Sequence, residues 1–169
     1  MKDLLEIAGA KLNQAIERVV SDLQDRVGKA QAEFARRGVL HSSMHLDGVV
    51  RECCAAYDDA VDVISREIEW VMKQSFYVTE SKARSLAEFG NVHLDPLTTR
   101  CIDHYERASR VLKNSGFLAA FEQRLVDKRR SAAEAIALFI RRWRAENQRN
   151  VLRKLLSIIL GPLKTPYRS

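Results

Sequence analysis

The sequence predicts an all-α protein, a bundle of four to five helices. Apolar residues recur every three or four positions over long stretches, as on one face of a helix, and no stretch of useful length alternates as a strand does. Only 7 Gly and 3 Pro occur among the 169 residues, and these are the residues that interrupt helices. A chain of this length favours one domain with a sizeable core. We therefore expect a single helical domain over residues 1–161 and a flexible C-terminal tail over residues 162–169.

Residues 2–36 form the first predicted helix. Its apolar positions advance by three or four from Leu5 to Phe34, so they stay within a narrow arc of the helix surface. Gly28 falls on the far side of that arc, where it lowers helix propensity without opening a hole in the core. Gly38 then ends the helix, because glycine is the usual residue after a last helical turn.

Residues 43–76 form the second predicted helix, with an apolar stripe from Leu46 to Val71 and Ser42 or Ser43 as its N-cap. Each of these two helices is roughly 50 Å long at 1.5 Å per residue. The short connection between them can join only neighbouring helix ends. The sequence therefore predicts an antiparallel hairpin in which the two apolar stripes face each other.

A short helix is predicted over residues 81–89. Thr79 or Ser81 is placed to cap its first turn, and Gly90 is the expected terminator. A few apolar residues between these signals give it a modest buried face.

The next predicted helix covers residues 96–115. Asp95 at its N-cap and Pro96 at its first position form a strong start signal, because the carboxylate accepts from an unpaired amide and proline presets φ. Its apolar stripe consists of Leu97, Cys101, His104, Ala108 and Val111.

A helix over residues 117–147 follows, with an apolar arc from Leu118 to Trp143. Beyond it we expect a C-terminal amphipathic helix over residues 150–160. The candidate partner-binding residues of this helix are Leu152, Leu155, Leu156 and Ile159. In an unbroken helix they would point some 150° away from the earlier arc. The pattern therefore predicts either a bend at residues 146–150 or a different partner for the last turns.

Positive charge is concentrated in the last part of the chain. The net charge is +6, yet residues 1–100 carry 13 Lys or Arg against 16 Asp or Glu, whereas residues 101–169 carry 15 against 6. This asymmetry favours an anionic partner, or pairing of one half of the molecule with the other. The candidate anion-binding or nucleic-acid-binding residues are Lys128, Arg129, Arg130, Arg141, Arg142, Arg144, Arg149, Arg153 and Lys154. A solvated helix face explains the same residues, because no helix-turn-helix or zinc-finger spacing accompanies them.

Acidic residues gather in the second helix as Asp58, Asp59 and Asp62, away from its apolar arc. The pattern indicates a solvated face or a dock for a basic partner, including the C-terminal half of the same chain. Cys53 falls on the buried arc and Cys54 near its edge, as inert packing residues do.

His41 and His45 are the nearest approach to a metal-ligand pair, since two histidines four apart on one helix can bind a metal ion. His41, however, precedes the expected N-cap, so the two do not share one helix. The adjacent serines lack the strand-to-helix turn of a hydrolase nucleophile. His104 lies on an apolar stripe, which favours an interhelical role over that of a catalytic base. The sequence therefore favours a non-enzymatic protein and indicates no cofactor and no catalytic residue.

The leading functional hypothesis is a helical-bundle protein that acts by protein–protein association, in particular self-association. The alternative is a nucleic-acid-binding module that uses the basic C-terminal helices. A metal-binding or enzymatic protein centred on His41 and His45 is the third. No uncharged stretch is long enough to span a membrane, although the cationic, amphipathic C-terminal segment is compatible with peripheral membrane contact. Only three cysteines and no secretory signal indicate a cytoplasmic protein.

Overall fold

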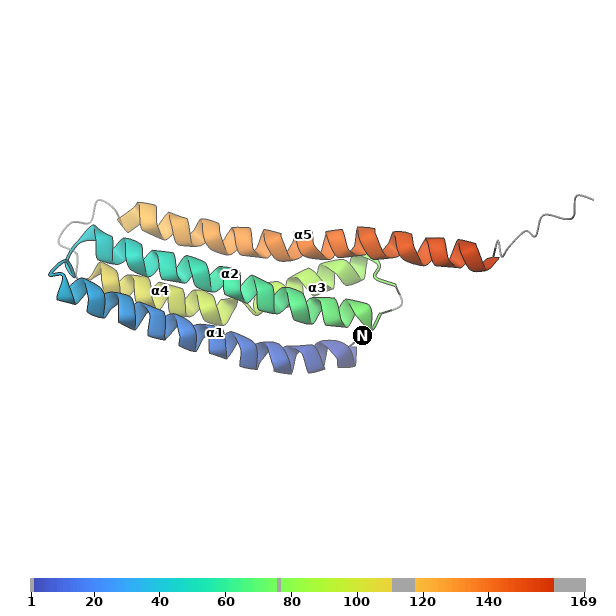
Figure 1. The fold of residues 1–169 in the computed structure, drawn as a ribbon, viewed down its shortest axis with the longest axis horizontal. Coiled ribbons are helices and arrows are strands. Elements are labelled where there is room, and N and C mark those ends of the chain that lie inside the picture. The colour runs from blue at the N-terminus through green and yellow to red at the C-terminus, as the bar shows by residue number, and fades with distance from the viewer. Residues whose placement is uncertain (1, 76, 111–117, 160–169) are drawn as a thin grey trace, which may run out of the picture.

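In a computed structural model of the chain, residues 2–75, 77–110 and 118–159 are described, with side chains described as far as residue 147. These residues form helices and no strand, which confirms the predicted all-α bundle (Figure 1). The helices in chain order are α1 (Lys2–Arg36), α2 (Ser43–Lys73), α3 (Glu80–Val92), α4 (Asp95–Ser109) and α5 (Leu118–Ile159). The predicted tail at residues 162–169 lies outside the described residues.

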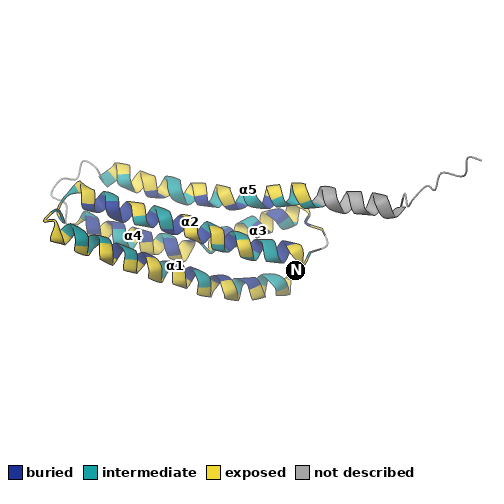
Figure 2. Cartoon of the chain, in the orientation of Figure 1, coloured by how far each residue is buried: buried dark blue, intermediate teal, exposed yellow. Residues whose placement is uncertain are grey.

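Helix α2 lies at the centre of the bundle. It packs against all four other helices, with α1 and α5 on opposite sides of it (Figure 1). Helices α3 and α4 follow one another along the bundle, separated by a two-residue turn at His93 and Leu94. The buried residues lie on the helix sides that face one another, and the exposed residues lie on the outer sides (Figure 2).

The α1–α2 hairpin is present as predicted, and Gly38 forms its corner. Gly38 has φ of 71°, in the left-handed region that glycine adopts at low cost. Its amide donates to the Ala35 carbonyl at 3.0 Å, and the Val39 amide donates to the Phe34 carbonyl at 3.0 Å. This pair of bonds satisfies the last carbonyls of α1 in a Schellman motif. Ser42 occupies the N-cap position of α2, but its hydroxyl donates back to the Val39 carbonyl at 2.6 Å instead of capping the helix.

The predicted apolar stripe of α2 is buried along its whole length. From Leu46 to Val71, each stripe residue is at most 1% exposed. Val49, Ala56 and Met72 are also fully buried, although they lie outside that stripe. The buried surface of α2 is wider than its stripe because neighbours cover it on more than one side.

Helix α3 continues through Gly90 to Val92, so the predicted terminator and the predicted end at residue 89 are wrong. Gly90 is buried where α3 meets α2 and α5. A Cβ atom at this position would lie 3.0 Å from each of Ile64, Ile68 and Ile136. Gly90 therefore allows a close approach between helices and does not end one.

Helices α3 and α4 each begin one residue before the predicted start, at Glu80 and Asp95. The Thr79 hydroxyl accepts from the Lys82 amide at 3.2 Å and caps α3. In α4 the N-cap position belongs to Leu94, and Asp95 is already helical, with Pro96 in the first turn. Leu94 is fully buried in the tight turn after α3, which leaves the Asp95 carboxylate free for a contact with α5.

Helix α5 is a single helix, so the predicted separation into residues 117–147 and 150–160, with a possible bend at residues 146–150, is wrong. The intervening sequence contains neither Gly nor Pro, and the backbone hydrogen bonds continue through it. As a result, α5 extends past the ends of α2 and α3 (Figure 1). Helix α4 ends at Ser109, and the rest of the predicted helix to residue 115 lies largely outside the described residues.

We predict that Gly90→Ala lowers the free energy of unfolding by about 1–2 kcal/mol, because overpacking against three buried isoleucines exceeds the gain in helix propensity. Gly28→Ala is the matched control. A Cβ atom at Gly28 meets nothing within 4 Å. The free energy of unfolding of this variant should therefore rise by about 0.5–1 kcal/mol. Urea unfolding of both variants measures the two effects, and a stabilised Gly90→Ala would contradict the packing role of Gly90.

Candidate functional site

The two histidines at the hairpin corner lie in different environments. His41 is exposed, whereas His45 is 1% exposed and its ring packs edge-on against Phe34, with centroids 5.7 Å apart. Burial lowers the pKa of His45, and the Leu40 carbonyl only partly opposes this effect. No hydrogen bond of normal geometry joins either ring nitrogen to the described residues. His45 is therefore a neutral core residue at the hairpin corner.

The structure does not bring a third metal ligand to His41 and His45. Within residues 2–75, 77–110 and 118–159, no three His, Cys, Asp or Glu residues gather closely enough to hold a metal ion. The Ser42 hydroxyl, considered above as a nucleophile, is engaged by the Val39 carbonyl. The corner thus offers packing and capping contacts, and no assembled reactive group among the described side chains.

Two basic residues of α5 bind acidic residues of other helices. The Lys128 ammonium lies 2.6 Å and 2.8 Å from the two carboxylate oxygens of Asp58 in α2. At the next position of α5, the Arg129 guanidinium donates to the Asp95 carboxylate of α4 at 2.8 Å. Part of the acidic cluster of α2 therefore serves as a dock for the C-terminal half of the same chain.

Two further ion pairs extend this contact along the bundle. Arg124 donates to Asp47 of α2 at 2.7 Å, and Arg144 binds the Glu80 carboxylate at the start of α3. The hydrogen bond and positive charge of Arg144 lower the pKa of Glu80. Four basic residues of α5 thus contact three different helices.

The remaining candidate anion-binding residues fall into three groups. Arg130 pairs with Asp127 within α5, whereas Arg141 and Arg142 are exposed and form no ion pair with the described residues. The candidates whose side chains lie outside the described part are Arg149, Arg153 and Lys154, together with the apolar set Leu152, Leu155, Leu156 and Ile159. The outward basic surface is smaller than the sequence suggested, because acidic neighbours occupy much of it.

Asp59 and Asp62 complete the acidic cluster on α2. Asp59 lies 3.0 Å from the Arg26 guanidinium of α1. Asp62 is exposed. The three carboxylates of the cluster therefore face different surroundings and form no common site.

The cysteines are free, and Cys53 and Cys101 belong to the packing between α2 and α4, whereas Cys54 is half-buried. The Cys53 thiol donates to the Cys101 carbonyl at 3.9 Å, and both side chains are at most 1% exposed. Contact with the Cys53 thiol and burial raise the pKa of the Cys101 thiol, and burial raises that of Cys54. A protonated, buried thiol is a poor nucleophile, so these residues act as core groups.

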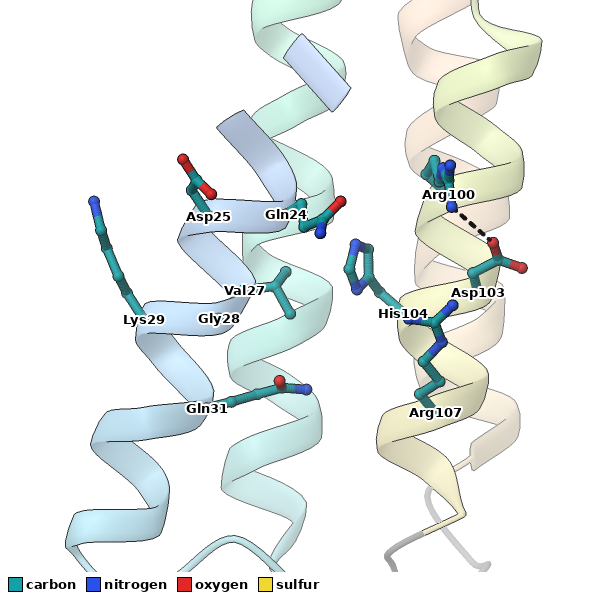
Figure 3. A pocket seen from close by; sticks show the side chains of 10 residues that line it. All are labelled: Gln24, Asp25, Val27, Gly28, Lys29, Gln31, Arg100, Asp103, His104 and Arg107. Carbon is teal, nitrogen blue, oxygen red and sulfur yellow. Dashed lines mark ion pairs between the residues drawn. The ribbon is translucent and has the colours of Figure 1, made fainter. Parts of the chain in front are cut away.

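A polar groove between α1 and α4 is a feature that the sequence reasoning missed (Figure 3). It has a volume of about 800 Å³, and half-buried His104 lies on its α4 side between Arg100 and Arg107. The spacing of these three residues, four and then three apart, places them on one helix face. That spacing was a signal in the sequence, but nothing in the sequence indicated that α1 would lie opposite.

The outer surface of α5 carries exposed apolar residues. Val126 is 55% exposed and Leu138 is 47% exposed. Among the described residues, no helix combines the length and apolar character needed to cross a membrane.

Comparison of the chain with protein-family models, with curated proteins and with solved structures finds no match. The function is therefore inferred from the sequence and the structure of the chain itself.

We predict that the protein loses stability as the pH falls below about 6.5, the ordinary pKa of histidine in an unfolded chain. Because burial lowers the pKa of folded His45, the unfolded chain binds more protons between that lower value and 6.5. The contribution of neutral His45 to folding stability is fully present above this pH window and is lost as the pH falls through it. His104, whose pKa is lowered by burial and by Arg107 and Arg100, adds to the loss.

His45→Leu should therefore lose less stability than the wild type between about pH 7 and pH 5. Urea unfolding at both pH values measures this difference. An unchanged pH dependence in the variant would contradict the assignment of His45 as a neutral buried group.

We also predict that Lys128→Glu destabilises the fold by up to about 1 kcal/mol, a small value because the Asp58 carboxylate is largely exposed to solvent. Asp58→Lys in the same chain should restore most of the loss, because the reversed charges attract again. Urea unfolding of the single and double variants at low salt measures the loss and its rescue. Added salt should reduce both, because it screens the charges. The control is Arg130→Glu, whose native pair lies within α5, so Asp58→Lys should not rescue it.

Proposed function

We propose that the protein is a non-enzymatic interaction protein that self-associates through the C-terminal part of α5. The observation that carries the proposal is that α5 runs beyond the ends of α2 and α3, two of the helices against which it packs (Figure 1). We call the last twelve residues of this helix, 148–159, the overhang. A short helical segment is only marginally stable in water by itself, so packing against a partner would stabilise it.

The sequence of the overhang supports a protein partner. It contains Leu152, Leu155, Leu156 and Ile159, and no acidic residue. Apolar residues gathered on a helical segment that extends past its neighbours are typical of an association surface. Burial of each such side chain contributes roughly 1.5–3 kcal/mol, so even a short paired segment gives measurable affinity.

A second copy of the chain is the partner that fits this composition best. In a two-fold symmetric dimer the same surface packs on itself, so an apolar overhang meets an equally apolar overhang. Three basic residues in the overhang (Arg149, Arg153 and Lys154) disfavour a broad contact between like charges. We therefore expect the apolar residues to form the centre of the interface and the basic residues to remain at its rim.

The other two hypotheses have less support. For nucleic-acid binding, Lys128, Arg129 and Arg144 are already paired with carboxylates of the same chain. For a metal site, the described residues at the hairpin corner supply no third ligand.

The free cysteines suit a reducing compartment, so we propose that the protein acts in the cytoplasm.

Size-exclusion chromatography with light scattering tests the proposal. The wild-type chain should change from one copy to two as its concentration rises. The double variant Leu152→Glu with Leu156→Glu should remain a single copy, because the charges cannot be buried between two overhangs. Its thermal unfolding should match that of the single-copy wild type, since the overhang runs past the ends of α2 and α3 (Figure 1).

Val126→Glu is the matched control, because it places the same charge at an exposed apolar position of α5 far from the overhang. It should dimerise like the wild type. A wild type that stays a single copy at every concentration would overturn the proposal, as would a double variant that still dimerises. A single copy that binds DNA or RNA at low salt, and loses this binding with Arg141→Gln and Arg142→Gln, would favour the nucleic-acid alternative.

A further inference from the structure

The groove between α1 and α4 gathers polar hydrogen-bond donors from both helices. On the α4 side, the His104 ring points across the groove toward α1 (Figure 3). On the α1 side, Gln24 and Gln31 lie two turns apart and face α4. Val27 is an apolar residue between them. The groove, with a volume of about 800 Å³, has room for a small molecule and is lined mainly by polar groups.

The charged side chains that line the groove, two acidic and three basic, leave one net positive charge. Arg100 is paired with Asp103, with 3.7 Å between the guanidinium and the carboxylate. Asp25 and Lys29, one negative and one positive, lie on the side of α1 away from α4 (Figure 3). Arg107 forms no ion pair or hydrogen bond with the described residues and lines the groove next to His104. The unmatched positive charge thus lies beside a half-buried imidazole.

We propose that this groove binds a phosphate group of a small polar molecule, with Arg107 and His104 as the principal donors. A guanidinium forms two parallel hydrogen bonds to phosphate oxygens, and it keeps its charge at every physiological pH. His104, three residues before Arg107, donates from the same helix face. The Gln24 and Gln31 amides supply neutral donors from the opposite wall.

The dimensions and lining of the groove define the class of ligand. A volume of about 800 Å³ exceeds what a phosphate ion fills and lies within the range of small-molecule sites. With Val27 as the single apolar side chain among the lining residues, the groove offers little surface to an aromatic or lipid body. A phosphorylated sugar has the matching chemistry, with hydroxyl groups for the amides and a phosphate for the cations.

Binding should be coupled to the protonation of His104. In the free protein, burial and the positive charges of Arg107 and Arg100 lower its pKa, and Asp103 opposes this. From α1, the charged groups at the edge of the groove are Asp25 and Lys29, whose side chains point away from α4 (Figure 3). A bound phosphate adds negative charge beside the ring and so favours the imidazolium form. The pKa of His104 should therefore rise when phosphate binds, and affinity should increase as the pH falls.

Proton NMR titration of the four histidine rings tests this inference on the full chain. The probes are inorganic phosphate and ribose 5-phosphate, each compared with chloride at equal ionic strength. The pKa of His104 should rise with at least one probe, whereas the exposed ring of His41 at the hairpin corner serves as an internal reference. A shift with ribose 5-phosphate alone would identify a phosphate ester as the ligand. A shift of equal size with both probes would identify the phosphate group as the part recognised.

Arg107→Gln should weaken binding by about tenfold or more, the loss expected for a charge-assisted contact. Arg110→Gln is the matched control, because Arg110 directly follows the last residue of the same helix but pairs with Glu106 and does not line the groove. Thermal unfolding of both variants should match that of the wild type. The inference is overturned if neither probe moves the pKa of His104, or if Arg107→Gln binds as tightly as the wild type.

Discussion

The burial of α2 is the constraint on which the rest of the structure depends. Helix α2 packs against every other helix, and its stripe from Leu46 to Val71 is almost completely removed from water. Burial of each large apolar side chain contributes roughly 1.5–3 kcal/mol, which makes this helix the main source of cohesion. Because neighbours surround α2, α1 and α5 can lie on opposite sides of the bundle and still belong to one core.

Polar contacts arrange the helices that apolar burial holds together. The cross-helix ion pairs of α5 lie at the surface, so each adds little to stability. Their partners are on α2, α3 and α4, however, and together they favour one rotation of α5 about its axis. That rotation turns several basic residues toward the bundle and leaves Arg141 and Arg142 facing solvent. The excess positive charge of the C-terminal half is therefore partly used within the molecule.

The two proposed interaction surfaces arise where the bundle is incomplete. The overhang exists because α5 is longer than the helices that cover it. The groove exists because α1 and α4 face each other there with polar side chains, which do not close the space as an apolar core does. The overhang is rich in apolar residues, as expected for a protein-binding segment, whereas the groove is polar, as expected for an anion site. The two are at different places in the fold and can operate independently.

The sequence by itself determined the helical class, the α1–α2 hairpin and the buried faces, because these follow from local spacing and from glycine at the corner. Only the tertiary structure decided what depends on distances between helices. From the sequence, Gly90 is expected to end a helix. In the structure it allows the close approach of Ile64, Ile68 and Ile136. The role of the acidic cluster as a partner for α5 depends on the packing that places Lys128 opposite Asp58. Periodicity assigns a residue to a face of its own helix, but only packing determines which helix that face meets.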